Sequence, residues 1–266
     1  MSSGLKFITI DNQKKGVRKF ELDMFASIPT ILIIAKRRSG KSWLCRDLLR
    51  YFKSVPAGII IAKTEGKGDP FYAEFFPESY IYYNYSSNIL KKIFKRQSKF
   101  IEKSKLKAKS GIIIDPRFIL LMDDCLSDKG EWANDQLMLK LMFEGRHDKI
   151  IFILTMQTPL GIGTQLRGNF DYYFLLAEDQ QRSIKNLYEN YAGFVKNLNT
   201  FKTIFKQLTT DFHMMVVANV GANEDISKKI YWYKATGDKV GNFGCSQLKL
   251  LDKYNYNPDW NKDYND

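Results

Sequence analysis

The stretch Ala35-Lys36-Arg37-Arg38-Ser39-Gly40-Lys41-Ser42 decides the fold, because it matches the phosphate-binding pattern G-x-x-x-x-G-K-[ST] at every position but the first. An apolar run at residues 29–35 precedes it and a helical pattern at 41–52 follows, which is the order of strand, loop and helix that the pattern requires. Ala35 stands where glycine is usual, and we expect alanine to be tolerated if this position keeps a negative φ. A chance match at a strand-to-helix junction is the alternative.

The chemistry expected of this loop is the binding of ATP together with Mg²⁺. Backbone N–H groups at the start of a helix bind phosphate, Lys41 can reach the outer phosphates, and the Ser42 hydroxyl suits Mg²⁺. The predicted nucleotide-binding residues are Arg37, Arg38, Ser39, Gly40, Lys41, Ser42 and Trp43.

Two carboxylates, Asp123 and Asp124, end a second apolar run at residues 116–124. A carboxylate at such a strand end binds Mg²⁺ in phosphate-loop domains, so we assign Asp123 to the metal, through water or through Ser42. Asp124 would polarise the attacking water, a role that glutamate has in most ATPases of this division. Its shorter side chain requires a compensating shift of roughly 1 Å in the backbone or the water. A strand that ends in a solvated turn is the alternative.

Three further polar side chains lie around a third apolar run at residues 149–157. Gln157 ends the run, where a glutamine can sense the γ-phosphate or orient water, and an exposed strand-end glutamine is the alternative. Arg146 precedes the run and Arg167 follows it, and either guanidinium suits the phosphate oxygens of a neighbouring subunit's nucleotide. Arg146 is the preferred arginine finger, Arg167 is the second candidate, and a solvated arginine is the alternative for each. The predicted catalytic residues are Lys41, Asp124, Arg146 and Gln157.

The predicted fold is α/β, a P-loop NTPase (ASCE, RecA-like) with a largely parallel sheet covered by helices on both faces. Short apolar, β-branched runs separated by polar or helical sequence are typical of such a buried parallel sheet. The predicted strands lie at residues 29–35, 57–64, 116–124, 149–157, 170–177 and 213–220, with an edge strand at 229–235 and a mostly helical segment at 184–205.

The chain is predicted to contain three regions. Residues 1–28 hold two strand-like stretches, at 5–10 and 17–25, which predict a β-hairpin appended to the core. Residues 29–250 form the P-loop ATPase domain. Residues 251–266 are rich in Asn, Asp and Tyr, which predicts an extended or mobile tail.

The net charge of +12 and the pI of about 9.4 favour polyanionic partners. The strongest basic run, residues 91–109, holds nine positive residues and one acidic residue, Glu102. Its apolar stripe predicts a helix with a basic outer face, and a merely solvated face is the alternative. The candidate nucleic-acid-binding residues are Lys92, Lys95, Arg96, Lys99 and Lys103.

Other features of the composition exclude several classes of protein. The three cysteines, Cys45, Cys125 and Cys245, form no CxxC pair, so neither a disulfide framework nor a zinc ribbon is indicated. With two histidines, a His-based nucleophile or metal site is not expected. The longest apolar runs are far shorter than the roughly 20 residues of a membrane span. The first residues lack the apolar stretch of a signal peptide, so we expect a protein that is not secreted by that route.

Several motifs carry a family resemblance. They are Ser39-Gly40-Lys41-Ser42, Thr64-Glu65-Gly66, Phe71-Tyr72, Phe76-Pro77, Asp123-Asp124-Cys125, Gly145-Arg146-His147, Thr155-Met156-Gln157-Thr158-Pro159-Leu160-Gly161 and Leu166-Arg167-Gly168-Asn169-Phe170-Asp171. This succession resembles the virion DNA-packaging ATPases of poxviruses and giant viruses, which belong to the FtsK/HerA class. The resemblance covers roughly residues 28–220, and its later motifs are more specific than the phosphate loop alone.

The resemblance implies that Lys41 and Ser42 bind nucleotide and magnesium and that Asp123-Asp124 is the Walker B pair. It implies Gln157 as the sensor and Arg146 as the finger. It also implies a pentameric or hexameric ring around double-stranded DNA, a capsid or portal component as partner, and a place in the host cytoplasm (the viral factory) or the virion. Ala35 departs from the family's usual glycine, and DNA cutting is not predicted because no C-terminal nuclease domain is seen.

The predicted function is an ATP-driven motor that hydrolyses the β–γ bond of ATP and translocates double-stranded DNA into a viral capsid. The alternative is a nucleotide-switched nucleic-acid-binding scaffold without steady turnover. A small-molecule kinase would require an acceptor pocket and an arginine-rich lid, and the sequence indicates neither.

Overall fold

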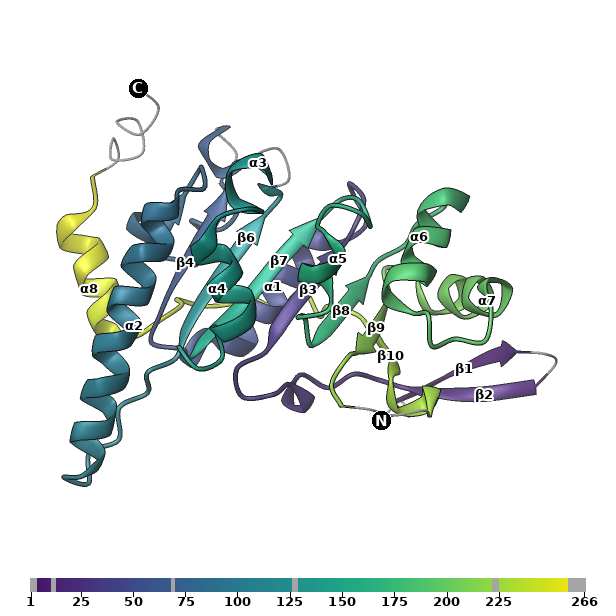
Figure 1. Cartoon of the computed structure of the whole chain (residues 1–266), viewed down its shortest axis with the longest axis horizontal. Coiled ribbons are helices and arrows are strands. Elements are labelled where there is room, and N and C mark those ends of the chain that lie inside the picture. Colours follow the sequence, from purple (N-terminus) through teal and green to yellow (C-terminus); the bar gives the residue numbers. More distant parts are fainter. Residues whose placement is uncertain (1–3, 11–12, 68–69, 126–128, 222–224, 258–266) are drawn as a thin grey trace. The chain divides into compact units, whose positions relative to one another are not determined.

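The computed structural model describes residues 4–10, 13–67, 70–125, 129–221 and 225–257 (Figure 1). Internal contacts divide these residues into two compact units. The first unit contains the described residues up to Asp47 together with Thr155–Gly237, and the second contains Leu48–Leu154 together with the described residues from Asp238 onward. The predicted borders at residues 28 and 250 do not coincide with this division and stay a prediction.

The main sheet is mixed and mostly parallel, as the sequence predicts, with eight strands in the order β10-β9-β8-β3-β7-β6-β4-β5. Every residue of β3, β4, β6 and β7 is buried, which is the pattern of parallel strands covered on both faces. The strands are β3 (Thr30–Ile34), β4 (Ala57–Ala62), β5 (Ile81–Tyr82), β6 (Phe118–Asp123), β7 (Ile150–Met156), β8 (Tyr172–Leu175), β9 (Met214–Ala218) and β10 (Ile230–Tyr233).

The first unit begins with an antiparallel hairpin of β1 (Leu5–Ile10) and β2 (Gln13–Arg18). The expected pairing is present, but the second strand begins four residues earlier than the predicted residue 17. After the hairpin, the Phe20 N–H donates to the Trp232 carbonyl, and the Phe20 ring packs edge-on against Tyr172. This aromatic contact joins the segment after the hairpin to β8. In the same unit, β8 pairs in parallel with β3, and β9 pairs antiparallel with both β8 and β10.

The helical segment predicted at residues 184–205 is two helices in the first unit. The break covers residues 192–197, where Gly193 lowers the cost of leaving the helix and the Asn197 side chain accepts the Thr200 N–H to cap the second helix. The unit's elements are α5 (Thr164–Arg167), α6 (Gln181–Tyr191), α7 (Leu198–Leu208), η1 (Leu22–Met24) and η6 (Ile226–Lys228). Helix α1 (Lys41–Tyr51) begins in this unit and ends in the second.

In the second unit, β5, β4, β6 and β7 pair in parallel, and α2 and α8 lie on the same side of this unit beside β4 (Figure 1). Residues 251–255 of the predicted extended or mobile tail belong to α8, so they are helical rather than extended. Among the residues of α8 whose burial is described, Leu248 alone is buried, so the sequence carried little apolar signal for this helix. Residues 258–266 of the predicted tail lie outside the described residues. The helices are α2 (Ser87–Ala108), α3 (Lys129–Trp132), α4 (Gln136–Glu144) and α8 (Ser246–Asn255), with the 3-10 turns η2 (Phe52–Ser54), η3 (Glu65–Lys67) and η4 (Glu78–Tyr80).

Candidate nucleotide-binding and catalytic site

The phosphate loop in the first unit leaves β3 and enters α1 through two residues with left-handed backbone, Arg38 (φ 62°) and Gly40 (φ 102°). The Gly40 carbonyl accepts the Leu44 N–H at 3.1 Å, so the helical hydrogen bonding begins at Gly40. A side chain at Gly40 would be strained whatever the space, which explains the glycine. Ala35 is buried and is not among the described non-glycine residues with positive φ, so the condition for alanine at this position is met.

Gln157 lies beside the start of this loop. The Ala35 N–H donates to the Met156 carbonyl at 2.9 Å, which holds the carboxyl end of β7 next to that of β3, and Gln157 is the following residue. On the other side, Lys36 forms an ion pair with Asp179 at 2.7 Å, beyond the end of β8. The first unit therefore brings together the phosphate loop and the proposed sensor.

Two exposed aromatic residues flank the first turn of α1. Trp43 is 53% exposed, and the Arg46 guanidinium lies 5.2 Å from its ring centroid. Phe212 is 63% exposed and its ring faces Gly40, where an added Cβ would lie 3.7 Å from it. Phe212 also has an unusual positive φ of 56°. Phe212 was not predicted as a site residue, because nothing in the neighbouring sequence indicates that it lies beside the loop.

The acidic strand end lies in the second unit. Asp123 ends β6 opposite Ala62 of β4 and is 5% exposed. Asp124 follows with a left-handed φ of 57°, a conformation that aspartate adopts more readily than most residues. Backbone outliers of this kind are found preferentially at functional sites.

Asp123 is held by a side chain that was not among the predicted site residues. The Tyr72 hydroxyl donates to Asp123 Oδ2 at 2.9 Å, and both residues are buried. Tyr72 is part of the Phe71-Tyr72 motif, but its position beside Asp123 depends on a contact across 51 residues of sequence. The contact could not have been read from local spacing.

The two arginine candidates differ sharply. Arg146 is exposed and precedes β7, whose Ile150 pairs with Phe118 at the start of β6. It therefore lies at the opposite end of β6 from Asp123, and a six-residue strand spans about 16 Å. A role of Arg146 beside Asp123 of the same subunit is thus excluded, and the role of a finger for a neighbouring subunit stays a prediction.

Arg167 is 8% exposed and lies within the first unit. Its guanidinium donates to Asn190 Oδ1 and, at 2.9 Å, to Thr164 Oγ1, and lies 6.0 Å from the Tyr191 ring centroid. These contacts join α5 to α6. A finger role for Arg167 would require the side chain to leave all of them.

Helix α2 has the predicted basic outer face. Its buried side is formed by Ile89, Leu90, Ile93, Phe94 and Gln97. Lys92, Lys95, Lys99 and Lys103 are exposed at positions that repeat every three or four residues, so they form one stripe. Arg96 differs, because its guanidinium lies 4.1 Å from the Phe100 ring centroid and 5.1 Å from that of Phe118, and burial lowers its pKa. Arg96 is a packing residue in this unit rather than part of the exposed stripe.

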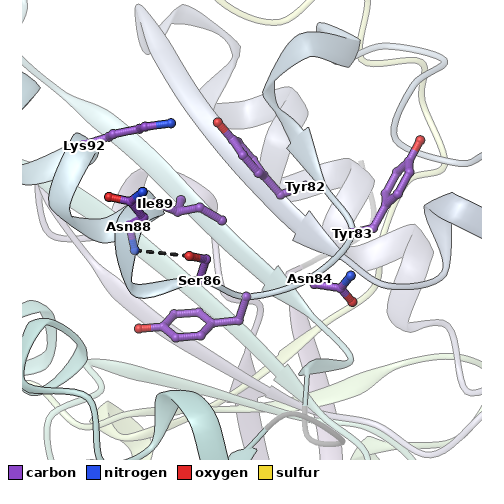
Figure 2. A pocket seen from close by; sticks show the side chains of 8 residues that line it. Tyr82, Tyr83, Asn84, Ser86, Asn88, Ile89 and Lys92 are labelled. Atoms are coloured by element: carbon purple, nitrogen blue, oxygen red, sulfur yellow. Dashed lines mark hydrogen bonds between the residues drawn. The ribbon is translucent and has the colours of Figure 1, made fainter. Parts of the chain in front are cut away.

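A small hollow adjoins the amino end of α2 (Figure 2). Lys92 and Asn88 line it from the helix, Tyr82 and Tyr83 line it from the preceding segment, and Ser86 Oγ caps α2 by accepting the Asn88 N–H. The cavity volume of about 180 Å³ is below the 300–1,000 Å³ usual for ligand sites. The hollow is therefore too small for a nucleotide.

The donor atoms near both motifs suit magnesium. No group of three or more His, Cys, Asp or Glu side chains with metal-site spacing occurs in the part of the chain that the structure describes. A phosphate-loop site needs fewer protein ligands, because Mg²⁺ retains waters and binds phosphates beside one carboxylate and one hydroxyl. The buried Asp123 carboxylate and the exposed Ser42 hydroxyl are oxygen ligands of the required kind. Within the described residues, no helix is long and apolar enough to span a membrane.

Comparisons with known proteins identify relatives of the whole chain. No protein-family model matches it. Uncharacterized protein L437 of Acanthamoeba polyphaga mimivirus is 41% identical over 250 residues, which cover 94% of this chain and 87% of the relative. Uncharacterized protein 075L of Invertebrate iridescent virus 6 is 32% identical, with 95% and 99% covered. The chain belongs to this viral protein family.

Solved structures with the same fold are ATPases of packaging and secretion systems. The genome packaging NTPase B204 from Sulfolobus turreted icosahedral virus 2, in complex with sulfate, has a TM-score of 0.53 and 14% identity, covering 79% of this chain and 98% of that one. The cytoplasmic domain of the Thermomonospora curvata type VII secretion ATPase EccC has a TM-score of 0.50 and 12% identity, covering 95% and 31%. The predicted P-loop NTPase fold of this viral family member is confirmed.

Proposed function

We propose that this chain is an ATPase that works as a ring-shaped motor and translocates double-stranded DNA into a viral capsid. The observation that carries the proposal is the phosphate loop, with left-handed Arg38 and Gly40 directly before a helix that begins at Lys41. The fold shared with a viral genome packaging NTPase supports the same conclusion. We further propose that the ring acts in the host cytoplasm or the virion.

The reaction is hydrolysis of the bond between the β- and γ-phosphates of ATP. Water attacks the γ-phosphorus, the bond to the β–γ bridging oxygen breaks, and ADP and phosphate are released. Asp124 accepts a hydrogen bond from the attacking water and Gln157 orients it, while Lys41 neutralises charge on the outer phosphates. Positioning and electrostatics, rather than covalent chemistry, supply most of the rate in this class of reaction.

Binding is assigned to the residues of the phosphate loop and to Asp123. The loop amides and the side chains of Arg37, Arg38, Ser39 and Trp43 contact the nucleotide. Ser42 and Asp123 would hold Mg²⁺, which would supply positive charge to offset the negative charge that develops on the phosphates.

A ring is proposed because Arg146 is exposed at the end of β6 that is remote from Asp123. We propose that the Arg146 guanidinium serves a neighbouring subunit's nucleotide. DNA is proposed as the partner because the exposed Lys92, Lys95, Lys99 and Lys103 stripe suits phosphate groups and adds to a net charge of +12. We propose a capsid or portal component as a further partner.

The test is phosphate release from Mg-ATP with and without double-stranded DNA, together with ATP-dependent displacement of a third strand from a triplex. We expect DNA-stimulated hydrolysis and displacement by the wild type, and loss of both in Lys41→Ala. The matched control is Lys185→Ala, which changes a lysine that is exposed on α6 and leaves the site intact. Stable ATP binding with no steady phosphate release would contradict the motor and favour a nucleotide-switched scaffold.

A further inference from the structure

A buried tyrosine contacts the carboxylate assigned to magnesium. Tyr72 is 1% exposed, and its hydroxyl donates to Asp123 Oδ2 at 2.9 Å. The χ2 angle of an aspartate has a broad energy minimum, so the carboxylate can rotate. A hydroxyl that donates to one carboxylate oxygen restricts this rotation and thereby the position of the other oxygen. The hydrogen bond from Tyr72 therefore restricts the rotation of the Asp123 carboxylate.

Tyr72 is itself held by a buried glutamate. Glu65 Oε1 accepts the Phe71 N–H at 2.9 Å, and Oε2 accepts the N–H groups of Tyr72 at 3.0 Å and Ala73 at 3.3 Å. One side chain thus binds three successive backbone donors. Burial raises the pKa of the Glu65 carboxyl, and the three N–H groups oppose that shift.

Strand pairing places Glu65 near the carboxyl end of β6. Ala62, the last residue of β4, pairs with Asp123, so the chain leaving β4 reaches Glu65 three residues beyond that pair. Gly66 then packs so tightly against the Tyr83 ring that an added Cβ would lie 2.8 Å from it. The backbone on both sides of Glu65 is therefore fixed by β4 and by Tyr83.

We propose that Tyr72 is a positioning residue for the metal ligand Asp123, and that Glu65 holds Tyr72 in place. The inference rests on the proposed function, because it requires Asp123 to bind Mg²⁺ in the nucleotide complex. No proton leaves the tyrosine in this role. Side chains that orient metal ligands typically change metal affinity by about 10- to 100-fold when they are removed.

The test is the affinity for Mn²⁺, measured by electron paramagnetic resonance in the presence of a non-hydrolysable ATP analogue. Tyr72→Phe should bind Mn²⁺ about tenfold more weakly than the wild type, while its affinity for the analogue without metal stays unchanged. In hydrolysis, Tyr72→Phe should need more Mg²⁺ for half-maximal rate and should regain most of its kcat at saturating Mg²⁺. Glu65→Gln should weaken Mn²⁺ binding in the same direction, because an amide cannot accept from all three backbone donors.

Tyr85→Phe is the matched control. Tyr85 is also buried in the second unit and donates to an aspartate, Asp135 Oδ2, at 2.5 Å, but Asp135 caps α4 and has no assigned metal role. Unchanged Mn²⁺ affinity in Tyr72→Phe would overturn the proposal, as would an equal loss in Tyr85→Phe. Failure of the proposed function is distinguishable, because the wild type itself would then bind no Mn²⁺ with the analogue.

Discussion

The phosphate loop and the acidic strand end are built in opposite ways. The loop at residues 35–42 is made by consecutive residues, and its shape depends on backbone conformation at Arg38 and Gly40. The acidic end is made by side chains from separate segments, in which Glu65 binds residues 71–73 and Tyr72 binds Asp123. A structure built from consecutive residues can be predicted from their spacing in the sequence. A structure built from long-range contacts cannot.

The largest expected effect concerns Arg146, which lies outside both the phosphate loop and the acidic strand end. Arg146→Ala should bind ATP normally, because Lys41 and the loop amides remain, but it should hydrolyse about 10³- to 10⁵-fold more slowly if Arg146 is a finger in trans. Steady-state phosphate release measures the rate. Mixing Arg146→Ala with Lys41→Ala should restore partial activity, since some interfaces of a mixed ring contain one intact loop and one intact finger.

Two outcomes would contradict this assignment. Absence of any rescue on mixing would contradict action in trans. Normal hydrolysis by Arg146→Ala with loss in Arg167→Ala would move the finger to Arg167. Because Arg167 is buried between α5 and α6, thermal unfolding must accompany that comparison, and we expect Arg167→Ala to lower the unfolding temperature.

The second prediction separates the two carboxylates of the acidic end. Asp124→Asn should still bind Mg-ATP but hydrolyse about 10²- to 10⁴-fold more slowly, because the attacking water loses its acceptor. Asparagine also tolerates the left-handed φ of this position, so the backbone should be unaffected. Asp123→Asn should instead lose metal binding, as Mn²⁺ titration would show. The opposite pattern would mean that the two roles are exchanged.

The parts of the structure that depend on local sequence could be predicted. Apolar runs predicted β3, β4, β6 and β7 because a central parallel strand is apolar on both faces. The spacing of Gly40, Lys41 and Ser42 predicted the loop and the start of α1 because that structure is local. The helical break at residues 192–197 was missed, since a helical pattern continued on both sides of it.

The unpredicted parts of the site depend on contacts between distant segments. Tyr72 meets Asp123, and Phe212 meets the loop at Gly40, only after strands have paired. The long side chain of Arg96 was assigned to the basic face because of its charge, whereas it stacks against Phe100 and Phe118. Long cationic side chains often bury their stems against aromatic rings, and sequence spacing does not reveal when they do so.

The third prediction concerns a region outside both motifs, the exposed lysine stripe of α2. Reversal of Lys92, Lys95, Lys99 and Lys103 to Glu should weaken DNA binding for all sequences. It should also reduce the slope of log affinity against log salt by about 3 to 4, because each phosphate contact contributes roughly one unit. Basal hydrolysis without DNA should persist. The control variant reverses four exposed lysines elsewhere, Lys15, Lys185, Lys196 and Lys206. An unchanged slope in the α2 variant would mean that the stripe is merely solvated.

The smallest expected effect is the pH dependence of stability that the buried Glu65 carboxyl produces. The folded state raises the pKa of Glu65, so it holds the proton more tightly than the unfolded chain does. The resulting stability is present below the unfolded pKa of about 4.3 and is lost as pH rises through the folded pKa. Urea unfolding should therefore show the wild type losing stability relative to Glu65→Gln as pH rises in that window. A difference in unfolding free energy that stays constant with pH would contradict a raised pKa of Glu65 in the folded state.

We propose that the phosphate loop at residues 35–42 and the Asp123 carboxylate at the end of β6 bind the same Mg²⁺–nucleotide complex. A double-mutant cycle tests it, with Ser42→Ala, Asp123→Asn and the double variant titrated by calorimetry with a non-hydrolysable ATP analogue and Mg²⁺. Two ligands of one metal ion should be coupled, with an interaction free energy of about 0.5 to 3 kcal/mol. Additive losses, within about 0.3 to 0.5 kcal/mol, would show that Ser42 and Asp123 do not share a metal and would contradict the account.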